Sequence, residues 1–144
     1  MKNDDKIKLF LVDDDTVFLK LLEIEFLQHT DFIIETYATG ELCIANLRHS
    51  PDVIILDYYL DGFDKNAMNG LQSLDIIKRF NPDIPVVMLS SQDKIDVAIN
   101  CMHHRAFDYV VKSETAFIRL QKIISAISRY KKMEKELNWY MERM

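Results

Sequence analysis

The sequence predicts an α/β domain in which helices surround a parallel β-sheet. Apolar runs alternate with amphipathic stretches along the chain, and five such strand-helix units can be counted. Most of the apolar runs are continuous, which is typical of strands that are buried on both faces of a sheet. The chain has 144 residues, of which 49% are hydrophobic and only three are glycine. This composition indicates one compact domain with a full hydrophobic core.

The predicted strands are the apolar runs Ile7–Val12, Phe32–Tyr37, Val53–Leu56, Ile84–Leu89 and Ala106–Val111. The predicted helices lie at Thr16–His29, Gly40–Arg48, Gly70–Phe80, Gln92–His104 and from Glu114 onward. The first helix places Val17, Leu21 and Ile24 along one side, and we expect this apolar stripe to cover the sheet. The turn Asn81-Pro82-Asp83 leads from the third helix into the fourth strand.

The last predicted helix is longer than one domain needs. Its apolar positions continue to the end of the sequence at Leu120, Ile123, Ile124, Ile127, Tyr130, Met133, Leu137, Tyr140 and Met144. We therefore predict a domain over residues 1–128 and a helical extension over residues 129–144 that projects beyond it. The extension is either a solvated tail cut from a longer chain or a helix that pairs with a second copy as a homodimer.

The overall composition argues against several classes of protein. The formal net charge is -5 and the pI is near 5.3, so we expect no direct binding of nucleic acid by this domain. No apolar run approaches the roughly 20 residues that span a bilayer. The segment Met1–Lys8 is charged rather than signal-like, which predicts a cytoplasmic protein without a membrane partner. Cys43 and Cys101 lie in predicted helices and are interpreted as small buried hydrophobes rather than a disulfide.

Chemically active side chains follow four of the predicted strands. Asp13 and Asp14 follow the first strand, Asp57 the third, Ser90 the fourth and Lys112 the fifth. The carboxyl ends of parallel strands lie at one edge of the sheet, where ligands of open α/β folds bind. Taken singly, each residue has a simpler interpretation, such as a helix cap. Together they predict one crevice lined by three acids, a hydroxyl and an amine.

These residue types indicate phosphoryl transfer. Clustered carboxylates repel one another and are best kept ionised by a cation, and Mg²⁺ suits them because it binds one or two carboxylates plus a phosphate. Asp57 is single and central, which favours it as the nucleophile. Asp13 and Asp14 are then the metal ligands, Lys112 holds a phosphoryl oxygen, and the Ser90 hydroxyl donates to the phosphoryl group.

The segments Phe10–Asp15 and Val53–Asp57 resemble those of the receiver domain of bacterial response regulators, and the resemblance covers roughly Lys6–Ser128. In that family an acidic pair ends the first strand and the phosphoacceptor ends the third. The resemblance implies a flavodoxin-like fold with strand order 2-1-3-4-5. It also implies a Mg²⁺ site made by Asp13, Asp14, Asp57 and the main-chain carbonyl of Tyr59.

The resemblance implies further roles for three residues. Ser90 matches the switch Thr/Ser of the family, Tyr109 matches the aromatic switch residue, and Lys112 matches the lysine of the phosphorylation site. A sensor histidine kinase or a phosphotransfer protein is the expected phosphodonor to Asp57. Ser90 is expected to move toward the phosphoryl group while Tyr109 turns inward. The domain is expected to take part in its own phosphorylation and slow dephosphorylation without being an enzyme in the usual sense.

Three departures from the family pattern stand out. The segment Leu60–Asn69 is longer by about five residues than the usual turn after the phosphoacceptor, as a tolerated surface loop or as a partner-specific contact. Ser113 replaces the usual proline after Lys112, so we expect the start of the last helix to differ. Arg105 occupies a position that is commonly glycine, which makes a left-handed helix cap there less favourable.

Other functions were weighed against the receiver interpretation. The segment Leu11–Val17 also fits the nucleophile motif of haloacid-dehalogenase-like phosphatases, but that family needs a further acidic motif after Lys112 and leaves Asp57 unexplained. A degenerate receiver that only docks partners would usually lack an acid or the lysine. Metal binding by Cys101, His103 and His104 is disfavoured because neighbouring residues of a helix point to different faces.

Overall fold

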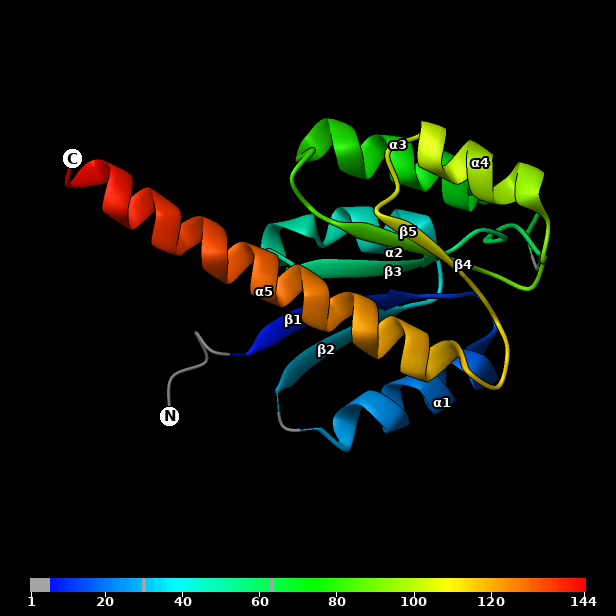
Figure 1. Cartoon of the computed structure of the whole chain (residues 1–144). Helices are drawn as coiled ribbons and strands as arrows, with labels where there is room; N and C mark the ends of the chain where they lie inside the picture. The colour runs from blue at the N-terminus through cyan, green and yellow to red at the C-terminus, as the bar shows by residue number, and fades with distance from the viewer. Residues whose placement is uncertain (1–5, 30, 63) are drawn as a thin grey trace.

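The structure, a computed structural model, describes residues 6–29, 31–62 and 64–144 of the chain. Within these ranges, five parallel strands form one sheet in the order β2-β1-β3-β4-β5, with helices packed around it (Figure 1). The strands are β1 (Ile7–Val12), β2 (Phe32–Tyr37), β3 (Val53–Asp57), β4 (Val86–Ser90) and β5 (Asp108–Val111). The helices are α1 (Thr16–Leu27), α2 (Gly40–Ala45), the 3-10 helix η2 (Leu47–His49), α3 (Gly70–Phe80), α4 (Ile95–His103) and α5 (Ala116–Glu142). The predicted flavodoxin-like α/β fold is confirmed.

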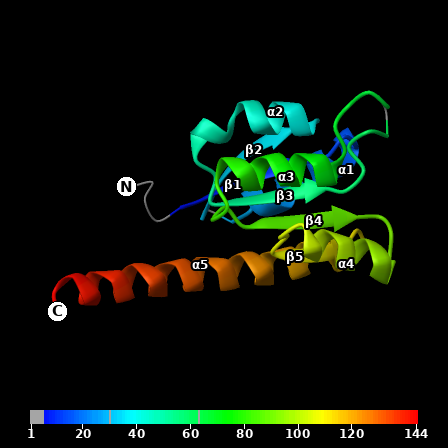
Figure 2. The same cartoon turned by 90° about the horizontal axis from the view of Figure 1, so that it is seen from above.

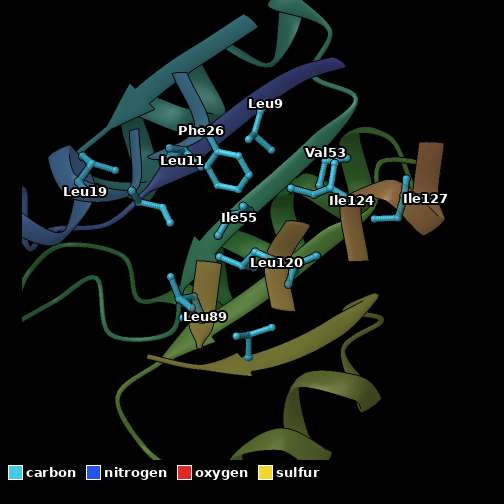
Figure 3. Packing of buried hydrophobic residues seen from close by; sticks show 14 residues of the cluster. Leu9, Leu11, Leu19, Phe26, Val53, Ile55, Leu89, Leu120, Ile124 and Ile127 are labelled. Atoms are coloured by element: carbon cyan, nitrogen blue, oxygen red, sulfur yellow. The ribbon is translucent and has the colours of Figure 1, made fainter. Parts of the chain in front are cut away.

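Both faces of the sheet are buried, because alternate residues of each strand enter different core clusters. One cluster joins the strands to α1 and α5 and contains Leu9, Leu11, Leu19, Phe26, Val53, Ile55, Leu89, Leu120, Ile124 and Ile127 among others (Figure 3). The other joins the strands to α2, α3 and α4 and contains Phe10, Val12, Cys43, Ile54, Leu56, Leu74, Ile77, Val86, Met88 and Cys101 among others. This two-sided burial explains why the strands read as continuous apolar runs.

Some element boundaries differ from the prediction. The fourth strand begins at Val86 rather than Ile84, since Pro85 has no N–H group to donate to a sheet ladder. The fourth helix begins at Ile95 rather than Gln92. The Gln92 N–H group instead donates to Ser90 Oγ at 3.1 Å, so the chain after β4 makes a turn before the helix starts.

The predicted core-facing side of the first helix was wrong. The buried residues of α1 are Leu19, Leu22 and Phe26. Val17 and Leu21, which belong to the predicted stripe, are 69% and 56% exposed. Apolar residues surround much of this helix, so a period of 3.6 residues cannot select one face from the sequence alone.

The expectation for Arg105 was also wrong. Arg105 adopts the left-handed conformation with a φ of 70°. Its N–H group donates to the Met102 carbonyl, and the next N–H group, from Ala106, donates to the Cys101 carbonyl at 3.1 Å. These two bonds form a Schellman motif at the end of α4. The motif satisfies carbonyls at the helix end and places Arg105 at the position that glycine usually fills.

Helix α5 runs from the sheet into open space, as predicted for the C-terminal extension (Figures 1 and 2). Its first half packs against the sheet through Ala116, Leu120, Ile124 and Ile127. Lys131 then donates from Nζ to the main-chain carbonyl of Asp52 at 2.8 Å. In the described part of the chain, no helix combines the length and the apolar character needed to cross a membrane.

Candidate functional site

The strand order brings the predicted site residues to one edge of the sheet. Asp13 directly follows β1, Asp57 ends β3, Ser90 ends β4 and Lys112 directly follows β5. Neighbouring strands hold these positions together: the Lys112 N–H group donates to the Ser90 carbonyl at 2.7 Å. Asp57 pairs with Leu89, the residue before Ser90, in the β3-β4 ladder.

Asp13 has one carboxylate oxygen that is poorly satisfied. The residue is 2% exposed, and its Oδ1 accepts a hydrogen bond from the Asp15 N–H group at 2.9 Å. Its Oδ2 lies 2.8 Å from Lys112 Nζ, a close ion pair that lacks the alignment of a hydrogen bond. The Lys112 ammonium is therefore the group that neutralises this buried oxygen. Such an oxygen is suited to bind a cation.

Asp57 is buried next to a second carboxylate, that of Asp13. It is 2% exposed, and its Oδ1 lies 3.6 Å from Lys112 Nζ and accepts a long hydrogen bond of 3.4 Å from the Tyr59 N–H group. Burial raises the pKa of Asp57 above its ordinary value, and the neighbouring Asp13 carboxylate raises it further, while Lys112 lowers it. In the absence of a cation, the site therefore resists full ionisation of both acids.

Lys112 is the positive centre of the site. Burial alone would lower its pKa, but the adjacent carboxylates of Asp13 and Asp57 more than offset this effect and raise the pKa above its ordinary value. The ammonium group also lies 4.7 Å from the centre of the Phe18 ring. This cation–π contact from α1 helps to fix a charge that is otherwise held by two carboxylates.

The three acids fit a divalent cation. Asp13, Asp14 and Asp57 each offer one oxygen, and these oxygens lie within 4.8 Å of one another. Mg²⁺ prefers oxygen ligands and retains several waters, so a cluster of this kind needs no further protein side chain. A bound cation would also offset the repulsion that raises the pKa of Asp57. The Tyr59 carbonyl as an additional ligand stays a prediction.

Gly70 allows α3 to begin against the end of β3. A Cβ atom at this position would lie 2.3 Å from the Asp57 carbonyl oxygen and 2.7 Å from the Tyr58 Cα atom. The Gly70 N–H group donates to the Tyr58 carbonyl at 3.0 Å. A side chain here would push apart the strand that carries Asp57 and the helix that follows it.

The two predicted switch residues are linked through Gln92. Ser90 is fully buried, and its Oγ accepts from the Gln92 N–H group. The Tyr109 hydroxyl donates to the Gln92 carbonyl, and its partly buried ring packs against the core cluster on the α2, α3 and α4 side of the sheet. A displacement of the Ser90 hydroxyl would therefore disturb the turn that holds Tyr109.

Sequence reasoning missed two contacts at the site. Phe18 approaches Lys112, and the Gly62 N–H group donates to Asp14 Oδ2 at 3.1 Å. The sequence carries no direct signal for either contact, because each joins segments that are far apart along the chain. Phe18 could only be noted as an apolar residue of α1, and Gly62 only as part of the long segment after Asp57.

The remaining candidate residues take ordinary structural places. Cys43 and Cys101 are both buried and free, as predicted. His104 Nδ1 contacts Asp75 Oδ1 at 2.8 Å, which ties the end of α4 to α3. Among the described residues, the acidic cluster at the sheet edge is the group of side chains arranged to hold a metal, and neither His103 nor His104 belongs to it.

Comparison with known proteins identifies a family for the chain. The family model for the response regulator receiver domain matches residues 9–126. The chain is 29% identical over 126 residues to the regulatory protein LuxO of Vibrio cholerae, a match that covers 87% of this chain and 27% of that protein. It is 34% identical over 139 residues to a protein-glutamate methylesterase/protein-glutamine glutaminase of Treponema pallidum, covering 90% of this chain and 33% of that protein.

A solved structure gives the same result for the fold. The signal receiver domain of a putative LuxO repressor protein from Vibrio parahaemolyticus superposes with a TM-score of 0.78 and 24% identity, covering 92% of this chain and 97% of that one. The chain thus spans about a third or less of the two curated relatives named above, while it matches nearly all of an isolated receiver. The family match over residues 9–126 favours the receiver interpretation over the phosphatase alternative. The chain belongs to the response regulator receiver domain family, the phosphoacceptor domains of two-component signalling.

Proposed function

We propose that Asp57 accepts a phosphoryl group from a sensor histidine kinase or a phosphotransfer protein in a Mg²⁺-dependent reaction. The observation that supports this most directly is the convergence of three carboxylates within 4.8 Å, with the Lys112 ammonium 3.6 Å from Asp57. A divalent cation held by the acid cluster, together with the partly buried Lys112 ammonium, would supply the positive charge that a negatively charged phosphoryl group needs. The phosphodonor proteins, and the activity of any longer protein that contains this domain, are part of the proposal.

In the proposed reaction, an oxygen of the Asp57 carboxylate attacks phosphorus, and the P–N bond of the donor phosphohistidine breaks. The donor imidazole leaves with the electron pair, and Asp57 becomes an acyl phosphate. Asp13, Asp14 and Asp57 would hold Mg²⁺, which supplies neutralisation of the phosphoryl oxygens. Lys112, whose ammonium has three N–H donors, donates one of them to a phosphoryl oxygen.

The consequence of phosphorylation is proposed to pass through Ser90. The new group adds roughly two negative charges at the end of β3 and attracts the Ser90 hydroxyl. Because Ser90 Oγ accepts from Gln92 and the Gln92 carbonyl holds Tyr109, this movement would release the tyrosine from its present contact. The result is a shift between two arrangements of the surface near β4 and β5.

The central test is direct phosphorylation in solution. We expect the wild-type protein, incubated with Mg²⁺ and acetyl phosphate, to gain one phosphoryl group by intact mass. Asp57→Asn should gain none, because the amide cannot act as the nucleophile. If the wild type gains no phosphoryl group, the result would support a degenerate receiver that only docks partners. If Asp57→Asn gains as much as the wild type, another residue is the phosphoacceptor.

We further propose that residues 1–128 form the receiver domain and that the extension, residues 129–144, pairs with a second copy of this chain as a homodimer. Four apolar residues of the extension, Tyr130, Met133, Leu137 and Tyr140, are each between 59% and 70% exposed. They follow alternate spacings of three and four residues, which is the pattern of a coiled-coil seam.

A further inference from the structure

The long segment after Asp57 is fixed at both of its ends. Its described residues are 60–62 and 64–69. Leu60 is 1% exposed and belongs to the core cluster on the α2, α3 and α4 side of the sheet. At the other end, Asn69 caps α3, where its side chain accepts from the Gln72 N–H group at 2.9 Å.

Between these ends, two backbone N–H groups donate to carboxylates from other elements. The Gly62 N–H group donates to Asp14 Oδ2 at 3.1 Å, and the Met68 N–H group donates to Glu41 Oε2 at 3.1 Å. Charge-assisted hydrogen bonds of this type are stronger than neutral ones. One of the two carboxylates belongs to the candidate metal cluster, so the segment is attached to the functional site itself.

The contact with Asp14 is close enough that residue 62 matters. A Cβ atom at Gly62 would lie 3.1 Å from Asp14 Oδ2, which is tighter than an ordinary carbon–oxygen contact. Glycine therefore lets the main chain approach the carboxylate without displacing it. Asp14 is only partly buried, and the Gly62 N–H group restricts one oxygen of its carboxylate.

We propose that Gly62 is a positioning residue for the metal-binding carboxylate of Asp14, and that attachment of the 60–69 segment and binding of Mg²⁺ are coupled. The inference rests on the proposed function, since it assigns Asp14 to the metal site. The segment holds one oxygen of Asp14 in place before the cation arrives, which reduces the ordering that binding requires. The insertion is then a part of the site rather than a neutral addition to the surface.

Coupling of this kind is reciprocal. If attachment of the segment raises the affinity for Mg²⁺ by some factor, Mg²⁺ must stabilise the attached segment by the same factor. Two independent measurements should therefore agree. One is the dissociation constant of Mg²⁺ in a variant that lacks the Gly62 donor, and the other is the exposure of the segment in the wild type with and without Mg²⁺.

The first measurement compares Gly62→Pro with the wild type by isothermal titration calorimetry of the full chain with MgCl₂. Proline removes the N–H donor, and we expect the dissociation constant to rise about three- to tenfold, the effect of losing one hydrogen bond of ordinary strength at a partly exposed position. Asp64→Ala is the control within the segment, since it removes the hydrogen bond that Asp64 Oδ1 accepts from the Asn66 N–H group and leaves the Gly62 donor in place. Calorimetry is preferred because the single tryptophan, Trp139, lies in α5 far along the chain from the site.

The second measurement needs no change at Gly62. Lys65 is exposed within the segment, so trypsin cleavage after Lys65 reports how often the segment detaches. We expect Mg²⁺ to slow this cleavage in the wild type by the same three- to tenfold factor, about the value expected from the titration. Asp13→Asn, in which the cation site is impaired, should show a much smaller effect of Mg²⁺.

The possible outcomes separate the two proposals. A wild type that binds no Mg²⁺ overturns the proposed metal site, and the coupling fails with it. If the wild type and Gly62→Pro bind Mg²⁺ equally tightly, and Mg²⁺ does not change the rate of cleavage after Lys65, the coupling is overturned while the proposed metal site stands. If Gly62→Pro does not fold, the cleavage measurement on the wild type decides the coupling by itself.

Discussion

Asp57 must be buried to be positioned and ionised to react, and these demands oppose each other. Burial and the neighbouring Asp13 raise its pKa from 3.8 to about 8 in the cation-free protein. A group whose pKa is raised on folding binds its proton more tightly in the folded state. Its protonated form stabilises the folded protein fully at pH values below the pKa of the group in the unfolded chain. This contribution is lost as the pH rises through the pKa of the group in the folded protein. Between pH 3.8 and about 8, the unfolded chain releases this proton while the folded protein keeps it, so the free energy of unfolding of the cation-free protein should fall as the pH rises.

This predicts that Asp57→Asn stabilises the protein when Mg²⁺ is removed. In EDTA at neutral pH, we expect the free energy of unfolding to increase by about 1–3 kcal/mol, because the amide is uncharged at every pH. Urea denaturation at several pH values would measure this, with the exposed Asp93→Asn as the matched control. Added Mg²⁺ should stabilise the wild type more than the variant. A less stable Asp57→Asn, or one with the pH dependence of the wild type, would contradict the assignment of strain to this carboxylate.

The residues of the site could be predicted from the sequence to different degrees. Asp13, Asp57 and Lys112 were predictable because parallel strands place their carboxyl ends together, whatever the details of packing. The contact between Gly62 and Asp14 was not, because it spans 48 residues and depends on the path of a segment without regular structure. Phe18 beside Lys112 was hidden for a related reason, since the rotation of α1 was not fixed by its apolar pattern.

Helix α4 shows how tertiary structure can override a local preference. The Schellman motif at its end requires a left-handed residue, and Arg105 fills that place although it has a Cβ atom. Side chains other than glycine pay about 1 kcal/mol or more for this conformation. The sequence suggested that arginine would avoid it, but the helix must end there because β5 starts at Asp108. The left-handed conformation of residue 105 is therefore set by its place between α4 and β5 and not by the preference of arginine.

We therefore expect Arg105→Gly to stabilise the protein by about 0.5–1 kcal/mol. Loss of the Arg105 charge has a second effect, because this charge lowers the pKa of Lys78 after the larger effect of burial. Arg105→Ala separates the two contributions, since it removes the charge and keeps a Cβ atom. Urea unfolding of the three proteins would measure both. If the glycine variant is no more stable than the alanine variant, the left-handed conformation carries no cost at this position.

At the level of the whole molecule, α5 links two distant regions. It starts shortly after Lys112 at the functional edge of the sheet, packs along the core and leaves the domain beyond Lys131 (Figure 2). Its buried residues lie in the first half of the helix and the exposed apolar residues Tyr130, Met133, Leu137 and Tyr140 in the second half, so pairing through the second half would leave the packing of the domain intact. This separation explains how one helix can carry a pattern longer than the domain requires.

The spacing of the extension fits a parallel pair of helices. With Tyr130 and Leu137 at a positions and Met133 and Tyr140 at d positions, residue 129 occupies a g position and residue 134 an e position. In a parallel dimer, Arg129 then faces Glu134 of a second copy, and symmetry repeats this opposite-charge pair. An antiparallel pair would not place these two charges together in the same way. The charges therefore favour two domains at the same end of a short coiled coil.

We expect the full chain to form a dimer whose population rises with concentration, because a seam of little more than two heptads gives modest affinity. Sedimentation velocity over a concentration series would measure this. Leu137→Lys places a charge in the seam and should give a monomer at all concentrations tested, as should truncation after Ser128. Asn138→Lys adds the same charge at a position outside the seam and should behave as the wild type. If truncation leaves the solution mass unchanged, the extension is not the dimer interface, and if both lysine variants weaken the dimer equally, net charge rather than the seam controls association.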